Sequence, residues 1–431
     1  MKKGSTRITA LLAGILLLGA ALLGAAGCGI TVKAENLMKD IAPGKAEEKT
    51  ADNAFVQSMA NFAVGLFQKT ANRQENTLLS PLSVMMALAM TANGADTQTL
   101  AEMEQVLGGG MPIEELNKYL YAYGKGLPSE KGARLQLANS IWFREQEELL
   151  QVEKEFLQTN ADYYQAAAYR SPFDAGTVRD INNWVKKSTD GLIEEILQEI
   201  DEDVVMYLVN ALAFEAEWQT NYEKNQIFEG NFTAANGEKR AADLMRSKEA
   251  RYIDDGRATG FIKDYKGGHY SFAALLPNEE VPIEEYIASL SGEGLLAVIK
   301  NAEAEGVEAI LPKFSYAYTV EMNDALRELG MPTAFDRMWA DFSRLGHASD
   351  DNTESGGADH NLSIGQVLHK TFITVDERGT KAGVATKVEI VSEGVEMLAH
   401  TVKLDRPFVY MILENGTGLP IFIGAVMDIG K

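Results

Sequence analysis

The run of residues 204–214 constrains the fold more than any other stretch, because it is almost wholly apolar. A strand that faces water on one side alternates apolar and polar residues, whereas a strand without that alternation is covered on both faces. We therefore expect a central strand buried on both sides.

Other segments carry clear periodicity. Apolar residues at helical spacing from Phe55 to Phe67 predict a first helix that begins near Asn53, and Ser80-Pro81 predicts a second, with Ser80 as its cap, that ends at Asn93-Gly94. Further helices are predicted over residues 96–107, 113–123, 153–160 and 178–188. Short apolar segments rich in β-branched or aromatic residues predict strands over residues 135–143, 271–276, 307–311, 370–375, 402–403, 408–413 and 421–425. Helices gather early and strands late, which indicates an α+β fold with large antiparallel or mixed sheets.

The charge and the chemistry-bearing residues exclude several classes of function. A formal net charge of −22 over 431 residues argues against nucleic acid, and the chain has no dense basic stretch for heparin. The five histidines show no ligand spacing and there is one cysteine, so we expect no metal, no cofactor and no disulfide framework. Nucleophile-elbow, phosphate-loop and dinucleotide motifs are missing. An unrelated cell-surface enzyme is therefore a remote alternative.

The N-terminus is typical of a targeting segment. Lys2, Lys3 and Arg7 precede an uncharged apolar run over residues 8–27, and the small residues Ala25-Ala26-Gly27 lead into Cys28. This ending resembles a bacterial lipoprotein signal, although that signal prefers leucine where Ala25 stands. We expect a signal peptide over residues 1–27, lipid attachment at Cys28, a flexible tether over residues 28–50 and one domain over residues 51–431, outside the cytoplasm at the cell membrane or surface. The alternative is an uncleaved transmembrane anchor, since about 20 apolar residues span a bilayer.

Residues 375–386, VDERGTKAGVAT, can be both a loop and a strand. The glycines, alanines and threonines suit a flexible surface loop. In a strand, however, Thr380, Ala382, Val384 and Thr386 would share one face, while Lys381 and Lys387 would point the other way. A segment acceptable in both states is what a switching element requires.

Many motifs, in order, identify a family resemblance. They run from about Asp52 to the C-terminus and comprise Asn76 with Ser80-Pro81-Leu82-Ser83, residues 137–143 (LANSIWF), 209–214 (VNALAF) with Trp218, 311–314 (LPKF), 340–343 (ADFS), His369-Lys370 and Arg406-Pro407-Phe408. Together they resemble the serpin family over a complete domain. Two departures stand out: Glu215-Ala216-Glu217 replaces a basic triplet before Trp218, and the loop of residues 349–360 is longer than usual.

The resemblance implies a fold of three β-sheets with about nine helices and an exposed reactive-centre loop, here about residues 377–401. It implies a monomer that inhibits serine endopeptidases, and by extension cysteine proteases. The protease cleaves the loop and forms a covalent acyl complex, and the loop then inserts into the main sheet. The alternative within the family is a non-inhibitory binding or storage protein. Small hinge residues after Glu377 favour inhibition, namely Gly379, Thr380, Ala382, Gly383 and Ala385.

The resemblance also implies roles for residues outside the loop. A polar cluster of Ser80, Ser83, Asn210 and His369 would control opening of the sheet, and Lys313 would pair with Glu377 beside Trp218 at the loop base. From the residues alone, Ser80 serves equally well as a helix cap, and His369 as a hydrogen-bonded core histidine.

Two counts give different bonds for cleavage. In the family the cut follows the seventeenth residue from the hinge glutamate, which from Glu377 gives Glu393-Gly394. Counting back from Pro407-Phe408 instead leads to the neighbourhood of Glu396-Met397, because the reactive loop is about three residues longer than usual. The second choice is therefore the bond Met397-Leu398. We expect Glu393-Gly394 first, since the length between hinge and cut sets how far the protease is carried.

Overall fold

The computed structural model describes residues 31–145, 150–191, 193–200, 204, 206–348, 362–381 and 398–430. These residues contain nine α-helices: α1 (Asn53–Thr70), α2 (Pro81–Ala92), α3 (Thr97–Gly108), α4 (Ile113–Gly126), α5 (Lys154–Tyr164), α6 (Ala175–Ser188), α7 (Ile283–Ser289), α8 (Gly292–Lys300) and α9 (Asn323–Leu329). This number agrees with the count of about nine that the resemblance implies. Ser80 caps α2 as predicted, because its side chain accepts from the Ser83 N–H and Pro81 is the first helical residue.

Three large sheets carry the strands. The large sheet has seven, in the order β1 (Glu35–Asn36), β5 (Ala167–Ser171), β3 (Ala133–Arg144), β6 (Met206–Glu217), β16 (Gly379–Lys381), β15 (Gln366–Val375) and β13 (Phe314–Glu321). The six-stranded sheet runs β2 (Thr77–Leu79), β19 (Pro420–Val426), β18 (Phe408–Glu414), β11 (Tyr270–Pro277), β10 (Ala258–Asp264) and β9 (Arg251–Asp254). The four-stranded sheet runs β17 (His400–Lys403), β12 (Val307–Pro312), β8 (Lys239–Glu249) and β7 (Ile227–Thr233), and β14 (Gly346–Ala348) pairs with β4 (Leu150–Val152).

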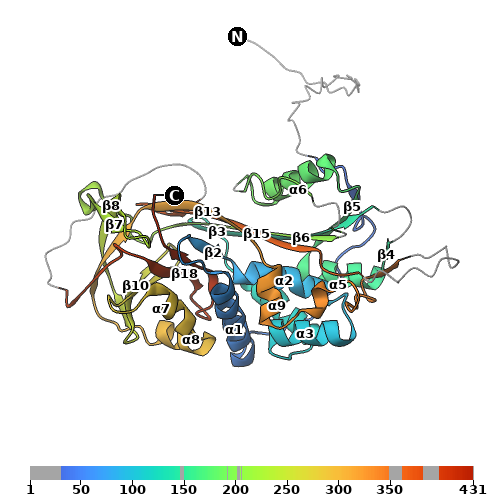
Figure 1. The fold of residues 1–431 in the computed structure, drawn as a ribbon, viewed down its shortest axis with the longest axis horizontal. Coiled ribbons are helices and arrows are strands. Elements are labelled where there is room, and N and C mark those ends of the chain that lie inside the picture. The colour runs from blue at the N-terminus through green and yellow to red at the C-terminus, as the bar shows by residue number, and fades with distance from the viewer. Residues whose placement is uncertain are drawn as a thin grey trace, which may run out of the picture.

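The large sheet lies between α6 on one face and a layer containing α2 and α9 on the other (Figure 1). Alternate residues of β6 therefore meet two different cores. Leu208, Leu212 and Phe214 pack with the α2 side, whereas Tyr207 and Val209 pack with the α6 side. This double burial, predicted from residues 204–214, leaves β6 without a solvent face along most of its length.

Residues 31–50 lie against the body, which corrects the expectation of a flexible tether. The backbone N–H groups of Lys33 and Ala34 both donate to the Asp180 carboxylate on α6 at 2.8 Å, and β1 pairs with β5. Farther along, ion pairs join the segment to α4: Lys49 with Glu115, Glu47 with Lys118, and Glu48 with Lys125. The partners of residues 31–50 are backbone and charged groups distant in sequence. The scarcity of large apolar residues in this segment, which suggested a tether, gives no information about such contacts.

Candidate functional site

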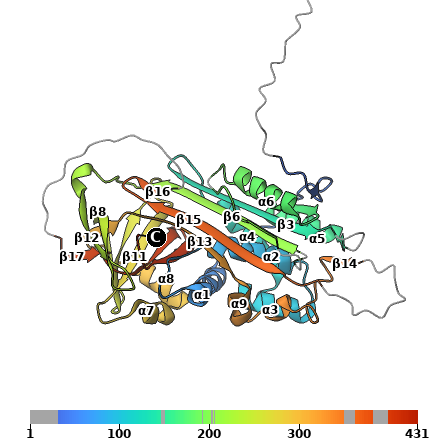
Figure 2. The same ribbon diagram turned by 45° about the horizontal axis from the view of Figure 1, so that its top comes forward.

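A three-residue strand enters the large sheet between its two central strands. β15 reverses at Asp376–Arg378, and β16 then pairs antiparallel with it, Thr374 with Lys381 and Val375 with Thr380. On its other side β16 pairs with β6, Gly379 with Glu217 and Thr380 with Ala216. Figure 2 shows β16 lying between β6 and β15 at one end of the sheet. The segment after β15 thus begins as a strand that is paired on both sides.

The two first residues of β16 fit closely into that position. Thr380 is 2% exposed, and its hydroxyl lies 2.5 Å from the Tyr265 hydroxyl. A Cβ at Gly379 would lie 1.9 Å from the Ala216 carbonyl oxygen, so the close approach of the two backbones requires glycine here. The site therefore selects small residues for a geometric reason.

Trp218 packs against this turn and stabilises it. Its ring is fully buried, stacks on Tyr265 at 4.6 Å between centroids, and donates from Nε1 to the Asp376 carbonyl at 2.8 Å. Its backbone N–H donates to the Arg378 carbonyl, also at 2.8 Å. One residue thus holds the turn through ring stacking and two hydrogen bonds.

An ion pair closes the base of the turn. Lys313 Nζ lies 2.9 Å from Glu377 Oε2, as the resemblance implies, and 3.8 Å from Asp243. Partial burial alone would raise the pKa of Glu377, but the hydrogen bond and charge of Lys313 outweigh it and lower that pKa. Glu377 is therefore an anion at neutral pH and keeps the pair intact.

Beyond β16, the two central strands are paired over a short distance. In the described part of the sheet, β6 and β15 pair directly at Gln366 with Tyr207 and at Val367 with Leu208, which is the end farthest from β16. Between these rungs and β16, the described register joins β6 on that side to neither strand. A strand entering from β16 would therefore separate two direct rungs.

Three of the four predicted polar residues take part in two hydrogen-bonded pairs near this opening. His369 Nε2 accepts from the Ser80 N–H at 3.1 Å, and Asn210 donates to Asn139, a partner the sequence did not single out. The hydroxyl of Ser83 is buried without a hydrogen-bond partner among the described residues. The pairs lie on β15 with α2 and on β6 with β3, so they tie each side of the opening to its neighbour.

Burial lowers the pKa of His369 to about 4, so the ring is neutral at pH 7 and can accept from Ser80. The unfolded chain, with a histidine pKa near 6.5, binds the proton first as the pH falls. We therefore expect native stability to drop between about pH 6.5 and 4.

His369→Ala should speed inactivation on mild heating at pH 7.5, because the buried Ser80 N–H then loses its acceptor, which costs about 1–3 kcal/mol. It should also remove part of the acid dependence.

The control for this prediction is His269→Ala, since His269 is half exposed beside Glu130. Rates of heat inactivation at pH 7.5 and pH 5 for the three proteins give the comparison. Equal rates for wild type and His369→Ala at both pH values would contradict the assigned role.

Several predicted residues lie outside the described ones. They are Cys28, Ala382, Gly383, Ala385, Glu393, Gly394 and Met397, together with the loop of residues 349–360. Leu398 is described and is partly buried. The sequence missed Tyr265 and Asn139, whose contacts with Thr380 and Asn210 span more than 70 residues of chain.

Comparisons with known proteins agree with this architecture. A family model described as serpin (serine protease inhibitor) matches residues 57–429. An uncharacterised serpin-like protein of Thermococcus kodakarensis is 28% identical over 382 residues, covering 86% of this chain and 85% of that protein. An alpha-1-antiproteinase of Equus caballus is 27% identical over 398 residues, covering 88% of each chain. The crystal structure of the thermophilic serpin tengpin in its native state has a TM-score of 0.86 at 49% identity, covering 92% of this chain and 100% of that one.

Proposed function

This chain belongs to the serpin family of serine protease inhibitors, and from that premise we propose that it traps proteases as a suicide substrate. The protease cleaves the segment after β16 and becomes acylated by it. The freed segment then extends β16 through the large sheet and carries the protease along before the acyl bond is hydrolysed. The partners are serine endopeptidases and, by the same acyl chemistry, cysteine proteases. The chain acts as a monomer and not as an enzyme.

The observation that carries this proposal is the register of β16. If this register continued along β6 and β15, Thr386 would lie opposite both Asn210 and His369. The residues that would face the α2 core are then Thr380, Ala382, Val384, Thr386, Val388 and Ile390. All six are small or β-branched, and in such a strand the two lysines of this stretch would face the other way. The side-chain oxygen Oδ1 of Asn210, buried without a partner in the described structure, would lie beside the Thr386 hydroxyl.

The energy for trapping comes from completing the sheet. Each ladder hydrogen bond formed by insertion contributes about 0.5–1.5 kcal/mol net. A ladder of about ten such bonds would make insertion irreversible on the scale of ordinary protein stability. A strand extended from Thr380 to Glu393 would be roughly 43 Å long, so the acylated end would lie that far along the sheet from Thr380.

The test is incubation of the purified protein with trypsin-, chymotrypsin-, elastase- and subtilisin-like proteases, a glutamyl-specific protease and a papain-like protease. Trapping gives an SDS-stable complex with an active enzyme and none with the same enzyme blocked at its nucleophile. Cleavage without any complex across the whole panel would instead favour a non-inhibitory binding or storage protein.

The bond that is cut decides which protease fits. We expect cleavage at Glu393-Gly394, with the peptide released from the complex beginning at Gly394 in mass spectrometry. A peptide beginning at Leu398 supports the second choice, Met397-Leu398, and apolar specificity. A start before Val391 would contradict both counts.

We propose that Cys28 carries a lipid that holds the protein at the membrane outside the cytoplasm. The support is the apolar run of residues 8–27 followed by the chain's single cysteine. Among the described residues, no helix is both long and apolar enough to span a bilayer. With Cys28→Ser, the protein should either appear in the soluble fraction or keep its signal peptide uncleaved. The same membrane distribution and the same mass as the wild type would favour the uncleaved anchor.

A further inference from the structure

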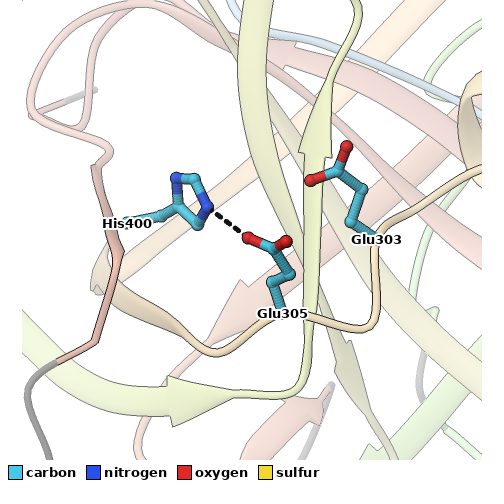
Figure 3. Close-up of side chains that lie close together, drawn as sticks. All are labelled: Glu303, Glu305 and His400. Carbon is cyan, nitrogen blue, oxygen red and sulfur yellow. Dashed lines mark hydrogen bonds and ion pairs between the residues drawn. The ribbon is translucent and has the colours of Figure 1, made fainter.

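Two carboxylates and one imidazole meet at the edge of the four-stranded sheet, away from the hinge. Glu303, Glu305 and His400 each offer a ligand atom, and these atoms lie within 4.8 Å of one another. Figure 3 shows His400 Nε2 directed at Glu305, at 2.7 Å from Oε2, with Glu303 beside them. His400 and Glu305 are 95 residues apart in sequence, which explains why ligand spacing predicted no metal site.

The backbones that carry these side chains are joined to one another. The His400 ring stacks on Tyr252 at 3.9 Å between centroids and 7° between planes. Tyr252 and Glu303 exchange two backbone hydrogen bonds, of 3.0 and 2.8 Å. His400 is also the register partner of Val307 at the start of β12. The three groups are therefore held close together before any ligand arrives, which lowers the cost of binding.

The local charge favours a cation. The carboxylates of Glu303 and Glu305 lie close together in a chain of net charge −22. A divalent ion would offset that repulsion.

The geometry points to a Zn²⁺ site formed by His400 Nε2 and the carboxylates of Glu303 and Glu305. Imidazole and carboxylate ligands suit zinc, and three protein ligands leave a fourth position for water. Calcium and magnesium prefer sets of oxygen ligands, so the imidazole selects against them. The competing interpretation is a plain histidine–glutamate ion pair that binds no metal.

Bound zinc would fasten an edge strand. β17 is the outermost strand of its sheet and pairs parallel with β12 through residues 400–403. Glu303 and Glu305 belong to the segment that leads into β12, so the ion would tie the first residues of the two neighbouring strands together. Given the proposed function, β17 is also the C-terminal base of the reactive loop. The ion would then fix that base while the hinge end moves.

The test measures zinc binding directly and needs no protease, so its failure and failure of the proposed function are distinguishable. Full-length protein, freed of metal with a chelator, is titrated with Zn²⁺ in a calorimeter, and Mg²⁺ serves as the control ion. We expect one site, and H400A or E305Q should weaken it by at least about tenfold. The matched control is H269A, because His269 also lies half exposed near one glutamate, Glu130. It should bind zinc as the wild type does.

A second measurement follows β17 itself. Zinc should slow amide hydrogen exchange over residues 400–403 in the wild type and in H269A but not in H400A. Circular dichroism confirms that the variants are folded. Equal zinc affinity for wild type and H400A, or no binding by the wild type, would overturn the proposal.

Discussion

Replacing Thr380 with arginine is expected to turn the inhibitor into an ordinary substrate. Thr380 is 2% exposed and contacts Tyr265, so a guanidinium there would be buried without a partner or would pull β16 out of the sheet. Burying an unpaired charge costs several kcal/mol. Since each 1.36 kcal/mol on a barrier is a tenfold change in rate, insertion should slow by at least about a hundredfold. Hydrolysis of the acyl bond would then be faster than insertion.

The measurement is the ratio of SDS-stable complex to cleaved chain on a gel. The matched control is Thr374→Arg, because Thr374 lies on the outer face of β15, where its hydroxyl meets Ser315 at 2.8 Å. That variant should keep the wild-type ratio. Wild-type trapping by Thr380→Arg would contradict insertion through β16.

Truncating Trp218 to alanine should give the largest loss of stability among single changes at this site. The ring is fully buried, stacks on Tyr265 and donates to the Asp376 carbonyl. Deleting a buried tryptophan typically costs about 3–5 kcal/mol, and here a carbonyl also loses its donor. The expected result is a clear fall in the guanidinium midpoint of unfolding, followed through the remaining tryptophans.

Trp218→Phe separates the two contributions, because it keeps an aromatic ring against Tyr265 and removes the N–H donor. We expect its loss to be well under half of that of the alanine variant. If both variants unfold at the wild-type midpoint, Trp218 does not support the turn.

The elements of the fold were predictable where local pattern and tertiary position agree. Ser80 caps its helix and residues 206–214 are buried on both faces, as periodicity indicated. The alternating pattern predicted only which residues share a face with Thr380, and the structure shows that Thr380 is buried. The strand pairing that makes β16 a hinge could not be predicted locally, because it joins residue 380 to residue 216.

The contacts that the sequence did not reveal share one physical cause, which is polar recognition between distant segments. Residues 31–50 look like a tether because their partners are backbone groups, Asp180 and charges on α4. His400 looks isolated because its partners Glu305 and Tyr252 lie far from it in sequence. Composition and spacing report local preference, so such contacts appear only once the topology is known.

The paired position of β16 also sets the direction in which a new strand grows. Starting a strand is costly because several residues must be fixed before any ladder hydrogen bond forms, and β16 has already passed that stage on both sides. In the proposed insertion, further residues would then pair with β6 and β15 one after another, starting next to Thr380 and moving away from it. The direct rungs at Gln366 and Val367 lie at the opposite end and would open last. In the proposed insertion, these two rungs would hold β6 and β15 together until the last step.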